Sequence, residues 1–220
     1  MVEHAFRALA AVRGGRRAVH PIGRTFHATA RTRGGESSGV PFLDRAGEYP
    51  ALVRLSRGAG LPTFLPDVLG AAVRIHDGGG PGRHLDLLVS TALGRSPLLR
   101  HLPAPRRRLT SVYTSMAGYR TPRGRRYLAL LPDRRGARIG ADLAAVPTDG
   151  RARFLVAVAG RWGRWRVVGQ LVLRSPVTAE IDERLAFDPL ASGVAGLHAD
   201  GLLWRARRLA YRGSRKGRTR

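Results

Sequence analysis

The chain has 220 residues, of which 43% are hydrophobic, and its mean hydropathy is −0.19. These values are typical of one globular domain with a sizeable core, and they exclude a fibrous or wholly disordered chain. Because the chain contains no cysteine, disulfide frameworks, thiol nucleophiles, zinc ribbons and iron–sulfur clusters are excluded. No apolar run approaches the ~18 residues of a membrane span, and the first residues form a poor secretory signal, so we expect a cytoplasmic protein.

The charge is strongly positive: 39 Lys and Arg residues against 15 Asp and Glu residues give a net charge of +24. All but one of the basic residues are arginines, the exception being Lys216, and asparagine is absent. This usage is typical of a GC-rich genome, which explains the preference for Arg over Lys but not the shortage of acidic residues. An anionic partner is therefore expected, either nucleic acid, an acidic membrane surface or an anionic cofactor.

In chain order, an N-terminal arm over residues 1–16 precedes a series of alternating apolar and polar segments. Strands are predicted at Thr25–Thr32, Ala51–Arg57, Leu69–His76 and His84–Thr91, and a glycine-rich turn separates the last two. Their close succession favours antiparallel pairing.

The middle of the chain, Ser96–Arg126, is rich in Arg and Pro, and predicts a short helix and an irregular connection. Further strands are predicted at Tyr127–Leu131, Ala152–Ala159 and Trp165–Leu173, and the last two form a hairpin. A helix at Leu202–Lys216 and a basic tail over residues 217–220 end the chain. This order predicts a mainly β fold, in which an antiparallel sheet closes into a barrel or sandwich, with one C-terminal helix.

The predicted C-terminal helix carries a spaced set of aromatic and basic residues. Trp204, Arg207, Tyr211, Ser214 and Arg218 follow at steps of three or four and therefore share one face. An amphipathic helix packed on the sheet explains this pattern simply. The sharper hypothesis is that Tyr211 ligates haem iron while Arg207, one turn earlier, donates a hydrogen bond to its phenolate oxygen.

Five short motifs, in order, extend this hypothesis to most of the chain. They are RAVH at Arg17–His20 with Gly23 beyond it, VRLS at Val53–Ser56, the run from Asp67 to Arg74, Asp86-Leu87, and LAFDP at Leu185–Pro189 leading into GLLWRARRLAYRGSRKGR. Together they resemble the haem catalase superfamily. The resemblance covers neither Ser96–Arg126 nor the long arm and wrapping segment of standard catalases.

The resemblance implies a catalase-like antiparallel barrel domain over residues 17–216, with haem b bound between the barrel and the C-terminal helix. It implies Tyr211 as the iron ligand, Arg207 as its partner, and Arg17, Arg54 and Arg218 as the partners of the haem propionates. His20 matches the distal catalytic base, and Ser56 matches the residue that orients it. Thr91 falls where the family has its distal Asn, so we expect an enzyme acting on hydrogen peroxide or organic hydroperoxides that is weak as a catalase.

Two other functions stay open at this point. A barrel that has lost haem would be a basic binding module for nucleic acid or anionic lipid. A phosphodiesterase-type hydrolase would use the single His-Ala-Thr motif at His27–Thr29, but such enzymes need two copies and the chain has one. The oligomeric state is left open by the sequence.

Overall fold

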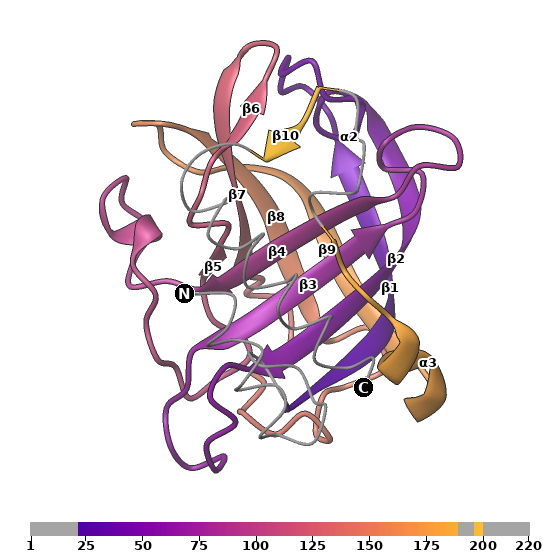
Figure 1. The fold of residues 1–220 in the computed structure, drawn as a ribbon, viewed down its shortest axis with the longest axis vertical. Helices are drawn as coiled ribbons and strands as arrows, with labels where there is room; N and C mark the ends of the chain where they lie inside the picture. The colour runs from indigo at the N-terminus through magenta and orange to yellow at the C-terminus, as the bar shows by residue number, and fades with distance from the viewer. Residues whose placement is uncertain (1–21, 189–195, 200–220) are drawn as a thin grey trace, which may run out of the picture.

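The computed structural model describes residues 22–188 and 196–199, and eight antiparallel strands of this part close into a barrel (Figure 1). The strands are β1 (Ile22–Arg33), β2 (Ala46–Arg57), β3 (Leu69–Ile75), β4 (Leu85–Thr91), β5 (Tyr113–Thr114), β7 (Gly124–Pro132), β8 (Arg153–Gly160) and β9 (Arg166–Pro176). Each pairs with its neighbour in the order β7-β5-β4-β3-β2-β1-β9-β8, and the β7–β8 pairing closes the ring. The predicted antiparallel β-barrel is confirmed.

The barrel follows from the alternation that the sequence shows. Alternate residues of each strand point inward and form one apolar core. Its members include Phe26 and Ala28 of β1, Val53 and Leu55 of β2, Val73 and Ile75 of β3, Leu87 and Val89 of β4, and Phe154 and Val156 of β8. The residues between them point outward. Every strand predicted from the sequence is present, although β1, β2 and β7 each extend beyond the predicted bounds.

The segment between β4 and β7 is more ordered than the sequence suggested. It contains the short 3-10 helix η1 (Leu99–His101), as expected, but also β5 and the strand β6 (Tyr119–Thr121), which pairs with β7. A last strand, β10 (His198–Ala199), pairs with β6 outside the barrel. These strands have two or three residues, too few to show an alternating pattern.

Two short helices accompany the barrel: α2 (Pro41–Asp44) lies between β1 and β2, and α3 (Ala179–Arg184) follows β9. In the described part of the chain no helix is long and apolar enough to cross a membrane. The predicted arm over 1–16, the predicted helix Leu202–Lys216 and the tail over 217–220 lie outside the described residues.

Candidate functional site on the outer face of the barrel

The outward-pointing residues of β1–β4, with the segment 177–188 that crosses them, form the candidate site, called here the outer face. In Figure 1, α3 lies at the lower right of the barrel, and the orange segment after it passes in front of the strands. Three of the eight predicted site residues lie in the described part of the chain: Arg54, Ser56 and Thr91.

Arg54 is a buried cation on the outer face, opposite Thr25 in the β1–β2 register. Its Nη1 donates a hydrogen bond of 2.6 Å to Oδ1 of Asp182 on α3, and the Thr25 hydroxyl donates to the same oxygen. The guanidinium passes directly over Gly23, where a Cβ would lie 2.6 Å from Arg54 Nη2. Glycine at position 23 therefore provides the space that this arginine occupies.

Ser56 lies on the same face as Arg54, two residues along β2. Its hydroxyl donates a 3.3 Å hydrogen bond to the carbonyl oxygen of Gly70 on β3. The register aligns Ser56 with Gly70, and Gly70 with Ser90 on β4, so these three residues form one outward row across the sheet. The row contains only small residues, of which Ser56 and Gly70 are buried and Ser90 is half-buried. A neighbouring group can therefore approach the backbone of the sheet closely along this row.

Thr91 does not share this face. It belongs to the inner alternation of β4 with Val89, and it pairs with the buried Tyr113. Its hydroxyl accepts a hydrogen bond from the backbone N–H of Leu69 at 3.0 Å and donates one to the carbonyl oxygen of Ala104 at 2.7 Å. Its side chain therefore points to the opposite side of β4 from Ser90, and its role at the distal Asn position stays a prediction from the sequence.

A second ion pair anchors the crossing segment on the outer face. Asp86 of β4, whose side chain is fully buried, accepts hydrogen bonds from Nε and Nη2 of Arg74 at 2.8 and 2.6 Å. Arg74 also donates to the carbonyl oxygen of Ala186, and the backbone N–H of Asp188 donates to Asp86 Oδ2. The Phe187 ring lies 5.4 Å from the Arg74 guanidinium. The hydrogen bond to Asp86 raises the pKa of Arg74.

The crossing segment is thus fixed at two points, by Asp182 at Arg54 and by residues 186–188 at the Arg74–Asp86 pair. The short helix α3 is set at its start by Thr178, whose hydroxyl accepts from the backbone N–H of Ile181. The LAFDP motif was evident in the sequence, whereas the contact of Asp182 with Arg54 and the bond from the Asp188 backbone to Asp86 were not. An N-cap threonine followed by acidic residues was the available signal for α3.

Five of the predicted site residues lie outside the described residues: Arg17, His20, Arg207, Tyr211 and Arg218. Their proposed roles as propionate partners, distal base, phenolate partner and iron ligand stay predictions from the sequence. The domain limits at residues 16 and 216 lie outside the described ranges as well.

Two histidines of the described part of the chain lie on the surface of the barrel. His27 of β1 is exposed on the outer face, while His76 is exposed just after β3. Within residues 22–188 and 196–199, no three His, Asp or Glu side chains come close enough together to hold a metal ion.

Comparisons with known proteins leave the family undetermined. A scan against protein-family models returned no match, and a search of curated proteins found no similar sequence. An antiparallel barrel hosts many unrelated functions, so the fold alone identifies none of them. Function has to be argued from Arg54, Ser56 and the segment that crosses them.

Proposed function

We propose that the outer face binds haem b and that the chain is a haem-dependent oxidoreductase acting on hydrogen peroxide or organic hydroperoxides. The observation that carries this proposal is the site of Arg54, a buried arginine whose guanidinium is held at an outward position beside small residues. The resemblance to haem catalases assigns a propionate-binding arginine to the same sequence position. The motif and the burial of this guanidinium both support Arg54 as a propionate partner.

The surroundings of Arg54 fit a carboxylate-bearing ligand. The carboxylate of Asp182 lies 2.6 Å from Nη1, so this guanidinium already engages a carboxylate on the outer face. A guanidinium has five N–H donors and can serve two carboxylates at different edges. The row of Ser56, Gly70 and Ser90 projects little beyond the backbone, as a planar macrocycle lying against the sheet would require.

Haem iron, when bound, would supply the redox chemistry that cleaves the O–O bond of a peroxide. The chain's own residues would place and protonate the substrate. His20 would accept a proton from the substrate oxygen and return it to the departing oxygen, and Ser56 would orient its ring. Arg17, Arg54 and Arg218 would pair with the propionates, and Arg207 would hold the Tyr211 side chain as phenolate.

Haem titration of the purified full chain tests the proposal without relying on activity. We expect a Soret band that saturates at one haem per chain. Arg54→Gln should weaken haem binding at least tenfold, because a charge-assisted pair would be lost. Gly23→Ala should weaken it as well, because the new Cβ would displace the guanidinium. The matched control is Arg31→Gln, which removes an exposed arginine of the same strand pair and should leave binding unchanged.

The iron ligand is tested by Tyr211→Phe, with Tyr49→Phe as its control. The first variant should lose haem or change its absorption spectrum, and the second should do neither. Circular dichroism spectra of all variants would separate a lost contact from a lost fold. If Arg54→Gln and Tyr211→Phe both bind haem with the wild-type affinity and spectrum, the proposal is wrong.

A further inference from the structure

Two loops carry exposed apolar side chains together with arginines. Leu98 is 71% exposed and Trp162 is 67% exposed. The exposed apolar residues of the loop 93–102 and the turn 161–164 are here called the leucine–tryptophan patch, and its members are Leu93, Leu98, Leu99, Leu102 and Trp162. Large side chains left in water at such close sequence spacing are typical of a binding surface.

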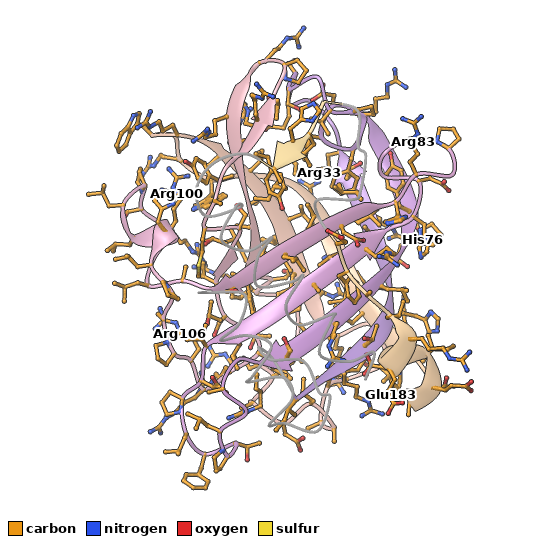
Figure 2. The ribbon with its side chains drawn as sticks, viewed as in Figure 1. Arg33, His76, Arg83, Arg100, Arg106 and Glu183 are labelled. Atoms are coloured by element: carbon orange, nitrogen blue, oxygen red, sulfur yellow. The ribbon has the colours of Figure 1, made fainter. Side chains whose placement is uncertain are left out.

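Hydrogen bonds join the two loops into one surface. Arg100 Nη2 donates to the carbonyl oxygen of Arg161 at 2.7 Å, and Trp165 Nε1 donates to the carbonyl oxygen of Arg95 at 2.8 Å. Figure 2 shows Arg100 on the left of the barrel, away from Glu183 at α3. The leucine–tryptophan patch is therefore separate from the crossing segment of the candidate haem site.

Arg100 forms the base of this surface. It is fully buried, and its guanidinium lies 4.9 Å from the Tyr127 ring and 5.2 Å from the Trp165 ring. Its Nε and Nη2 donate hydrogen bonds to backbone carbonyl oxygens. Its buried Nη1 has no hydrogen-bond partner among the described residues. Burial lowers the pKa of Arg100. Cation–π contacts with Tyr127 and Trp165 hold this guanidinium in place. Its hydrogen bond to Arg161 then anchors the turn 161–164 on the loop 93–102.

The loops that carry the patch are purely basic. Residues 93–102 and 160–166 contain Arg95, Arg100, Arg161, Arg164 and Arg166 and no Asp or Glu. Arg161 lies 5.4 Å from the ring of Trp162, while Arg166 pairs with Glu36. The exposed tryptophan and leucines thus share their segments with the exposed Arg95, Arg161 and Arg164. A bilayer surface with anionic headgroups offers the complementary arrangement, since phosphates lie above an apolar interior.

We propose that the leucine–tryptophan patch docks the protein peripherally on an anionic phospholipid surface. Arginines would contact lipid phosphates while the leucines and Trp162 enter the headgroup boundary. Nucleic acid fits the patch less well. It binds arginines and stacks on aromatic rings, but it offers no apolar phase that exposed leucines could enter. The proposal is independent of haem binding, since its residues lie outside the candidate haem site.

Vesicle co-sedimentation of the full chain tests this proposal. We expect binding to vesicles of phosphatidylcholine with about one third phosphatidylglycerol, and much weaker binding to phosphatidylcholine alone. Leu98→Ser combined with Trp162→Ser should lower the affinity for the anionic vesicles about tenfold or more. The control is Ile181→Ser, which removes an exposed apolar side chain on α3 and should have no effect.

A charge-matched pair of variants separates a local patch from general basicity. Arg161→Gln with Arg164→Gln should weaken vesicle binding about 25-fold, at roughly fivefold per arginine near the surface. Arg134→Gln with Arg135→Gln removes the same charge from an exposed loop elsewhere and should have a clearly smaller effect.

Two results would overturn the proposal. One is equal weakening by both arginine pairs with no effect of the apolar variant, which would indicate diffuse electrostatic adsorption. The other is an equal loss of affinity for duplex DNA and for vesicles in the Leu98 and Trp162 variant, which would make the patch a nucleic-acid surface. Quenching of Trp162 fluorescence by brominated lipid, absent in Trp162→Ser, would support insertion.

Discussion

Removing the Asp86 carboxylate should destabilise the protein strongly, because it anchors the crossing segment. Asp86 accepts two hydrogen bonds from Arg74 and one from the backbone of Asp188, and its side chain is fully buried. Breaking a buried pair on one side costs about 3–5 kcal/mol in the free energy of unfolding. The Arg74 side chain is 17% exposed and can partly recover hydration, so about 3 kcal/mol is expected for Asp86→Ala. That corresponds to roughly 6–12 °C in Tm for a chain of this length.

Urea and thermal unfolding followed by circular dichroism would measure this loss. The control is Asp149→Ala, which removes the exposed partner of Arg151 and should leave the transition unchanged, since exposed pairs contribute little. Replacing Arg74 by Met and Asp86 by Leu together should recover part of the loss, because no unpaired charge remains. The reasoning is refuted if Asp86→Ala unfolds at the same denaturant concentration as Asp149→Ala.

Three further predictions concern packing, pH and the distal position. Gly169→Ala should cost about 2–3 kcal/mol, because its Cβ would lie 2.1 Å from a backbone oxygen, whereas Gly160→Ala, with open space around it, should be tolerated in the same unfolding assay. Burial alone would raise the pKa of Asp44, but hydrogen bonds from Ser38 and Gly39 outweigh it and lower this pKa. The contribution of Asp44 to the free energy of unfolding is therefore present above about pH 4 and is lost as the pH falls further. Asp44→Asn should therefore show a flatter acid limb in a pH series of unfolding midpoints than the wild type. Thr91→Asn should cost about 1–3 kcal/mol in urea unfolding by breaking two buried hydrogen bonds, while Ser90→Asn, on the outer face, should not.

The strands could be predicted because their alternation is strong and local. Val53 and Leu55 alternate with Arg54 and Ser56, so β2 and the shared face of its two polar residues were both evident from the sequence. The barrel follows from several such strands in succession. The two- and three-residue strands β5 and β6 were missed because their pairing is set by tertiary contacts rather than by any pattern of their own.

The face of Thr91 could not be settled by counting along the chain. In a strand, a shift of one residue moves a side chain to the opposite face, so a short motif match that is uncertain by one position assigns the wrong side. The register decides the matter: Ser90 aligns with Gly70 and through it with Ser56, whereas Thr91 aligns with Tyr113 in the core. Ser90 is therefore the β4 hydroxyl that shares the face of Ser56.

If haem binds as proposed, the pairing of Arg54 with Asp182 would link haem binding to the position of α3. Asp182 and a haem propionate would then compete for the same guanidinium, unless each uses a different edge of it. If they share it, haem binding leaves α3 docked. If they compete, haem must release Asp182, which then loses the hydrogen bond from Thr25 as well. A ligand shifts an equilibrium only by its difference in affinity for the two states, here α3 docked and α3 released. Asp182→Asn should therefore strengthen haem binding if the two carboxylates compete, and leave it unchanged if they share the guanidinium.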